Sequence, residues 1–202
     1  MSGAASDAVL RRRAVPSRAA LSSLPEQAAA RKSPGMTPLP FDPIEEATRL
    51  WRSHGWPAAA DGMAVVTSLM RAQAIVQARV DDVLRPLELT FARYELLMLL
   101  QFTRDGRLSM TKAGARLQVH PASVTNAASR LEAAGLVTRR PDPADGRGVL
   151  MEITDAGRAL ADEATTLLNQ QVFGRPELAT PGMQALVDTL RELRRDAGDF
   201  QQ

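Results

Sequence analysis

Apolar residues recur at helical spacing along most of the chain after residue 40. Ile44, Ala47 and Trp51 share one face of a short helix that ends at the Gly55-Trp56-Pro57 sequence. Similar periodic stretches follow over residues 62–85, 90–102, 154–173 and 183–193. The pattern therefore predicts a mainly α-helical fold.

The stretch from residue 107 to residue 154 follows a different pattern. The elements expected there are short helices over 111–118 and 121–134, strands over 136–140 and 149–153, and a polar loop over 141–147. Pro121 lies in the first turn of its helix, where proline is tolerated. The order helix, turn, helix, β-hairpin wing predicts a winged helix-turn-helix lobe over residues 104–153.

The helices on either side of this lobe, in residues 41–103 and 154–202, form one helical region in this interpretation. The two helices after residue 154 carry apolar stripes and are separated by a loop that contains proline and glycine. A single small lobe cannot bury both stripes, so we expect a second copy of the chain to cover them in a homodimer. The alternative is that these helices fold back on their own bundle.

Residues 1–40 differ in composition from the rest of the chain. They have no aromatic residue, five of the thirteen prolines, and six Lys or Arg against two acids. Such a segment cannot bury enough apolar surface to offset the entropy of ordering, so we expect a disordered basic tail. The alternatives are a transit peptide, a translation start at Met36 and a basic arm that contacts DNA.

The formal net charge of +2 hides an uneven distribution along the chain. Residues 104–147 hold eight Lys or Arg against four acids, whereas residues 41–103 and 148–202 each hold more acids than bases. A basic block between two acidic ones gives a polarised surface, which is typical of proteins that bind nucleic acids.

The composition gives little support to catalysis. The chain has no cysteine, only two histidines, and no HExxH, GxSxG, GxGxxG or P-loop pattern. The neighbouring carboxylates Asp81 and Asp82 point about 100° apart on a helix, so they do not converge on one substrate atom. We therefore expect no enzyme activity, metal or cofactor. The absence of cysteine is compatible with a reducing cytoplasm, and the absence of a long apolar run predicts no membrane span, so we expect a cytoplasmic location.

The second helix of the lobe divides into an apolar and a polar face. The apolar residues, expected to pack on Ala115 and Leu117 of the first helix, are Val124, Ala127, Ala128 and Leu131. The outward residues are Ser123, Asn126, Arg130 and, in part, Thr125. Arginine binds guanine and asparagine binds adenine through paired hydrogen bonds, so this face suits the DNA major groove. The alternative is an ordinary solvated face.

Further DNA contacts are expected around this helix. Pro121 marks the positive end of the helix dipole, which favours phosphate. The candidates for phosphate contacts are Lys112, Arg116, Arg139 and Arg140. Arg147, expected at the tip of the hairpin, suits the minor groove, and Asp145 is expected to orient Arg147 or Arg140.

As an ordered set, these pieces resemble the multiple-antibiotic-resistance repressor (MarR) family of winged-helix regulators. The resemblance runs from Leu89 to Phe173, through LTFARYELLMLL and VHPASVTNAASRLEAAGLVTRRPDPADGRGVLMEITDAGRAL. Its most informative residues are Thr125, Arg130 and Leu131 on the second helix, Gly135-Leu136-Val137 before the wing, Pro143, Asp145 and Arg147 in the wing, and Ile153–Gly157 after it.

The resemblance implies a homodimer on a pseudo-palindromic DNA operator, repression of a neighbouring gene and release by a small, often anionic aromatic ligand. Asn126 stands where the family often has arginine, so a different operator preference is expected. Trp51 and Glu95 match the urate-responsive branch of the family, but the recognition-helix arginine of that branch falls at Ala127. The alternative function is a winged-helix module that binds proteins and not DNA.

A ligand site is expected between the long helix and the winged lobe. Its candidate residues are Trp51, Met63, Arg71, Phe91, Tyr94, Glu95 and Met98, of which Glu95 enters through the resemblance. Methionine and aromatic residues at helical spacing also form ordinary hydrophobic cores, and that alternative stays open.

Overall fold

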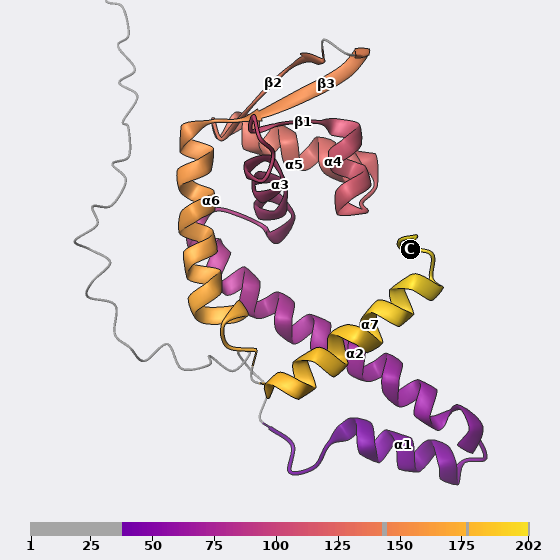
Figure 1. Cartoon of the computed structure of the whole chain (residues 1–202). Coiled ribbons are helices and arrows are strands. Elements are labelled where there is room, and N and C mark those ends of the chain that lie inside the picture. Colours follow the sequence, from indigo (N-terminus) through magenta and orange to yellow (C-terminus); the bar gives the residue numbers. More distant parts are fainter. Residues whose placement is uncertain (1–37, 143–144, 177, 202) are drawn as a thin grey trace, which may run out of the picture. The chain divides into compact units, whose positions relative to one another are not determined.

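The computed structural model describes residues 38–142, 145–176 and 178–201, without the side chains of residues 145–147. The predicted tail therefore lies outside the described residues up to position 37. In chain order the elements are α1 (Pro43–Ser53), α2 (Pro57–Leu84), the 3-10 turn η2 (Arg85–Leu87), α3 (Phe91–Gln101), β1 (Arg107–Ser109), α4 (Met110–Leu117), α5 (Pro121–Ala133), β2 (Val137–Asp142), β3 (Asp145–Ile153), α6 (Asp155–Leu168), the π-helical turn η3 (Asn169–Phe173) and α7 (Thr180–Asp196) (Figure 1).

Several helices begin at a side chain that caps their free backbone N–H groups. The Asp42 carboxylate accepts a hydrogen bond of 2.8 Å from the first turn of α1, and the Thr90 hydroxyl accepts one of 3.4 Å from α3. Thr154 accepts one of 3.0 Å from α6. Such caps stabilise a helix by about 1 kcal/mol. Thr90 and Thr154 thus begin the helices whose periodicity the sequence showed over 90–102 and 154–173.

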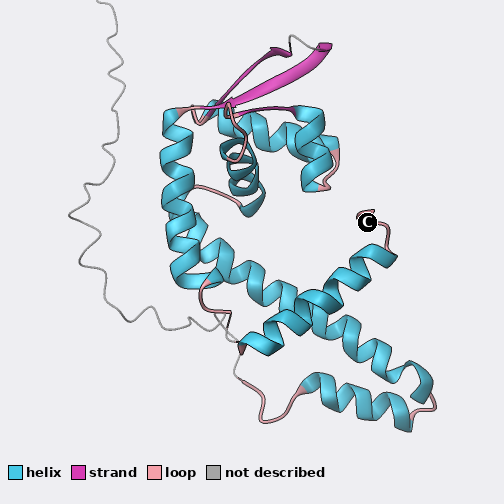
Figure 2. Ribbon diagram, viewed as in Figure 1, coloured by secondary structure: helices cyan, strands magenta, loops and turns pink. Residues whose placement is uncertain are grey.

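The wing is a three-stranded antiparallel sheet in the order β1-β3-β2 (Figure 2). Arg107 of β1 lies opposite Glu152 of β3, and Val137 of β2 lies opposite Ile153. Because side chains alternate along a strand, the sheet has one buried and one outer face. The buried face carries Leu108, Val137, Met151 and Ile153, and the outer face carries Arg107, Thr138, Arg140, Leu150 and Glu152.

The observed hairpin, strand β1 and the start of α2 differ from the sequence prediction. The hairpin strands extend to Asp142 and from Asp145, so the predicted loop over 141–147 is too long. Proline at position 141 is tolerated because β2 is an edge strand. Strand β1 was not predicted, since three residues are too few to show a period of two. Helix α2 begins at Pro57 and not at residue 62.

One hydrophobic core joins the sheet to the helices around it. Leu96, Leu97 and Leu100 of α3, Leu131 of α5 and Leu168 of α6 are fully buried in this core. Burying a leucine side chain stabilises a fold by about 1.5–3 kcal/mol. The core therefore holds α5 and the wing in a fixed relation to α3 and α6.

A compact junction connects α5, the wing and α6. Gly135 has φ +72°, and the N–H of Leu136 donates to the carbonyl of Leu131 at 2.9 Å, which ends α5 as a Schellman motif. The Thr154 N–H then donates to the Leu136 carbonyl at 3.1 Å, and its hydroxyl donates to the Gly135 carbonyl at 2.9 Å. The end of α5 thereby fixes where both β2 and α6 begin.

Helices α1, α2 and α7 leave much apolar surface uncovered. The exposed apolar residues are Val65, Val66, Met70, Ile75 and Val76 on α2, and Leu186, Val187 and Leu193 on α7. Helix α1 packs on α2, but α7 packs extensively on none of the other described elements and has no buried residue. Among the described helices, none is long and apolar enough to cross a membrane.

Gly157 tests the packing of α6 on the junction. A Cβ at this position would collide with the Leu136 carbonyl oxygen. Gly157→Ala is therefore expected to lower the free energy of unfolding by about 1–3 kcal/mol, measured by urea unfolding followed by circular dichroism. The control is Gly62→Ala on α2, where nothing lies within 4 Å of the added Cβ and alanine favours the helix. Equal stabilities of the two variants would contradict this packing.

Candidate nucleic-acid interface

Helix α5 has the two faces that its sequence predicts. Val124, Ala128 and Leu131 are buried, with Leu131 fully inaccessible, and Ala127 is half-buried. The outward residues Ser123, Thr125, Asn126 and Arg130 are all exposed. The predicted partner Ala115 is wrong, because it is exposed and the buried residue of α4 is Ala113. Gly114 faces α5, where a Cβ would make an ordinary van der Waals contact of 3.5 Å with Val124.

The N-terminus of α5 is exposed at the surface, and its first backbone N–H groups already have acceptors, since the Ser123 N–H donates to the His120 carbonyl at 2.8 Å. Pro121 occupies the first turn, and the Nδ1 atom of His120 accepts a hydrogen bond of 3.2 Å from the Ala122 N–H. His120 is therefore the N-cap of α5, a role that was not predicted from the sequence. The Thr125 hydroxyl donates to the Pro121 carbonyl at 3.0 Å, so its oxygen remains as an acceptor.

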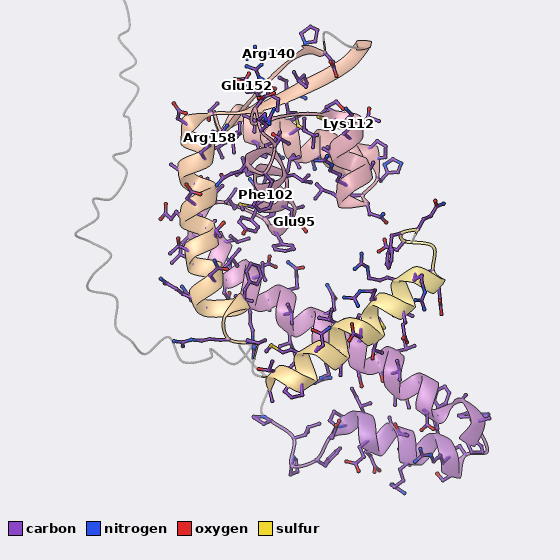
Figure 3. All side chains as sticks on the ribbon, viewed as in Figure 1. Glu95, Phe102, Lys112, Arg140, Glu152 and Arg158 are labelled. Carbon is purple, nitrogen blue, oxygen red and sulfur yellow. The ribbon has the colours of Figure 1, made fainter. Side chains whose placement is uncertain are left out.

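On this surface, the polar side chains expected to contact bases or phosphates form no hydrogen bond or ion pair with other described residues. Within the described part of the chain, Ser123, Asn126, Arg130 and Lys112 have no hydrogen-bond or ion-pair partner for their side chains. Unpaired donors on a rigid helix meet a ligand with little reorganisation. Figure 3 shows Lys112 on α4, on the same side of the lobe as the wing.

The wing arginines whose side chains are described, in contrast, are already paired with glutamates. The Arg139 Nε atom donates to Glu132 of α5 at 2.7 Å, on the core side of the sheet. On the outer face, Glu152 accepts from Arg140 and, at 2.9 Å, from Arg107. The sequence prediction named Arg139 and Arg140 as phosphate contacts and offered only Asp145 as a possible partner of Arg140, so it missed both glutamates.

These pairs determine the charge state of the glutamates. The hydrogen bond from Arg139 lowers the pKa of Glu132, and the hydrogen bonds and charges of Arg107 and Arg140 lower the pKa of Glu152. Hydrogen bonding to the charged form and a nearby opposite charge both favour ionisation. Both carboxylates are therefore ionised at neutral pH, and the pairs are ionic.

Only the backbone of Asp145 and Arg147 is described. Their backbone belongs to β3, so Arg147 lies within a strand and not at the hairpin tip, where it was predicted. Their side chains lie outside the described residues, and their proposed contacts stay a prediction.

The segment that contains α4, α5 and most of the wing is also the part of the chain that matches a known protein family. The sequence model of the MarR family matches residues 87–148. The MarR family transcriptional regulator Sco5413 of Streptomyces coelicolor is 46% identical, with a TM-score of 0.64, and the match covers 70% of this chain and 99% of Sco5413. This chain belongs to the MarR family.

Two further relatives of this MarR-family chain are more distant. BpsR of Bordetella bronchiseptica, whose DNA binding is regulated by 6-hydroxynicotinic acid, is 30% identical, with a TM-score of 0.56, over 64% of this chain and 97% of BpsR. The HTH-type transcriptional regulator TtmR of Methylorubrum extorquens is 35% identical over 107 residues. That match spans about half the length of each protein, 53% in both cases.

The predicted ligand residues of this MarR-family chain fall into two groups. Phe91 and Tyr94 stack with ring centroids 5.9 Å apart, and the Tyr94 hydroxyl lies 3.1 Å from the hydroxyl of Thr165 on α6. The same threonine hydroxyl lies 3.3 Å from the Met98 sulfur. This first group therefore packs between α3 and α6.

The second group lies on the helical hairpin formed by α1 and α2. Trp51 meets Trp56 edge to face at 5.4 Å, Met63 is half-buried one turn into α2, and Arg71 is exposed. No described contact joins these residues to the first group. A described hollow of about 350 Å³ lies elsewhere, between α4 and α5, beside Met110, Val119 and Val124. In the described residues no cluster of His, Asp or Glu could hold a metal ion.

Glu95 is the acidic member of the ligand prediction (Figure 3). It lies on α3 next to Tyr94, is half-buried, and has no hydrogen-bond or ion-pair partner in the described part of the chain. Burial raises its pKa, because an ionised carboxylate loses hydration there. An unpaired, partly desolvated carboxylate is a cost to the folded state at neutral pH.

Glu95→Gln is expected to raise the melting temperature at pH 7.5 by on the order of 2 °C, measured by circular dichroism. A carboxyl group whose pKa is raised by folding destabilises the folded state at pH values above that pKa. The destabilisation disappears at a pH where the group is protonated in both the folded and the unfolded state. The gain should therefore shrink as the pH falls towards 4.5, the ordinary value for glutamate. Glu163→Gln, at an exposed position on α6, is the control and should change little. A gain that is constant with pH would contradict this explanation.

Proposed function

We propose that this chain is a homodimeric, sequence-specific regulator of transcription that binds double-stranded DNA and represses a gene until a small aromatic or anionic ligand releases it. The observation that carries the proposal is the exposed polar face of α5, with unpaired donors, beside a basic wing. The proposed site of action is the bacterial cytoplasm, and the proposal includes no catalytic activity.

Helix α5 is the element that reads the bases in this proposal. Arg130 suits guanine, Asn126 suits adenine, and Ser123 donates to bases or phosphates. Thr125 can only accept, because its proton is already used within the helix. The positive end of the α5 dipole at Pro121 and the ammonium group of Lys112 attract phosphate and set the position of the helix without reading sequence.

The wing supplies the second set of contacts. Arg139 and Arg140 bind phosphates with the guanidinium N–H groups that their glutamates leave free, since a guanidinium carries five N–H donors. Arg147 enters the minor groove, and Asp145 orients it. The wing thus extends the contact beyond the major groove read by α5.

Uncovered apolar surface supports the dimer. Leu186, Val187 and Leu193 of α7 are each about half exposed, at 44%, 50% and 55%, and no described element of the same chain covers them. Apolar patches of this kind mark protein interfaces. A second copy related by a two-fold axis would cover them and present two α5 helices to one duplex.

The ligand would bind at the first group, near Phe91, Tyr94, Glu95 and Met98. The prediction that Trp51, Met63 and Arg71 share this site has no contact within the described chain to support it. BpsR, whose DNA binding is regulated by a hydroxylated pyridine carboxylate, supports a ligand of this class. The stacked rings of Phe91 and Tyr94 suit the aromatic part of such a ligand.

The division between base reading and phosphate binding gives a test. Arg130→Ala is expected to weaken binding by about 1–3 kcal/mol and to relax discrimination at one base position. Lys112→Ala should weaken binding to all duplexes and reduce the salt slope by about one unit. Fluorescence anisotropy measures both, with the duplex that the protein selects from a random pool and with a mixed-sequence duplex.

Two results would contradict the proposal. If neither variant changes the affinity or its salt dependence, α4 and α5 do not form the DNA surface. If the unaltered protein shows no salt-dependent binding to any duplex, the lobe is a protein-interaction module instead.

A further inference from the structure

Glu152 lies at the centre of the outer face of the wing, between arginines from the two neighbouring strands. Its two carboxylate oxygens are divided between them, one accepting from Arg107 of β1 at 2.9 Å and the other from Arg140 of β2. Arg107 lies directly opposite Glu152, and Arg140 is two residues along β2 from the opposite residue, Thr138. Figure 3 shows Arg140 and Glu152 together on the wing.

Exposure differs between the acid and the two bases. The Glu152 side chain is 23% exposed, whereas those of Arg107 and Arg140 are 46% and 51% exposed. Each guanidinium uses one terminal nitrogen for the carboxylate and keeps its other N–H groups towards solvent. The three side chains therefore present a surface of arginine donors with a net charge of one and not two.

We propose that Glu152 is a specificity-determining residue, which limits the attraction of the wing for DNA of any sequence by neutralising one of two arginines and holding both in place. This inference rests on the proposed DNA-binding function. Glu152 itself reads no base, and its effect is exerted through Arg107 and Arg140.

The physical basis is that phosphate contacts are independent of sequence. Each additional phosphate that a protein neutralises steepens the dependence of log K on log salt by about 0.9 and strengthens binding to every duplex. Two unrestrained arginines on the wing would do so wherever the protein meets DNA. Arginines held by a carboxylate keep one orientation and lose less side-chain entropy when they meet a phosphate at the selected site.

Glu152→Gln is the direct test, since it keeps the shape of the side chain and removes its charge. For a mixed-sequence duplex, the salt slope should steepen by about 0.9 and the affinity at 50 mM salt should rise roughly ten-fold. For the duplex that the protein selects from a random pool, the gain should be smaller, because the orientation of Arg140 is lost. The ratio of the two affinities should therefore fall.

Two further variants separate this role from a purely structural one. Arg107→Gln leaves Arg140 and Glu152 as a neutral pair, so the slope should become shallower by about 0.9. The double variant Glu152→Gln, Arg107→Gln restores a net charge of one and should restore the original slope. Glu163→Gln removes an exposed acid from α6 and should leave both affinities unchanged.

The outcomes distinguish this inference from the function on which it depends. If the unaltered protein binds a duplex and Glu152→Gln has the same slope and the same affinity ratio, the inference is wrong and the proposed function stands. A Glu152→Gln variant that no longer melts cooperatively would make Glu152 a structural residue and also overturn the inference. If the unaltered protein binds no duplex at any salt concentration, both proposals fail.

Discussion

The burial of one face of α5 is the constraint on which the rest of the binding surface depends. Val124, Ala128 and Leu131 are enclosed by the core of the lobe. A helix that buries this face must present the opposite face, with Asn126 and Arg130, to solvent. Polar residues that contribute nothing to the core are thereby held on a rigid element, which is the condition for reading the edges of bases.

The same helix also determines where the wing begins. The Schellman turn at Gly135 places Leu136 against the end of α5, and Thr154 then fixes the start of α6 against both. Arg139 and Glu132 tie the wing to α5 a second time. Helix α5 and the wing thus form one unit, so in the proposed function their spacing on DNA is set by the fold and not by a flexible link.

The elements that could be predicted from sequence are those with enough residues to show a period. The 13 residues of α5 gave its two faces correctly, whereas the 8 residues of α4 span little more than two turns, and the inward residue was misplaced from Ala113 to Ala115. The pairing of Arg140 with Glu152 depends on strand register, which a single strand pattern does not reveal. Because the register was unknown, the basic block could be predicted from sequence, but the pairing of its arginines with Glu132 and Glu152 could not. The apolar stripe of α7 was predicted from sequence, because it depends only on which residues lie on one helical face. The expectation that α6 also needs a second copy was wrong, because Ala161, Ala164 and Leu168 of α6 are buried in the core of the same chain.

The central claim is that two copies of the chain present two α5 helices to one duplex. The most direct measurement is to recover the fragments that the full chain binds from a random duplex pool and to sequence them. The account predicts an inverted repeat whose half-sites lie about one helical turn apart, roughly 10 base pairs. A single motif without a repeat would contradict the dimeric account, and recovery of no preferred sequence would contradict base reading by α5.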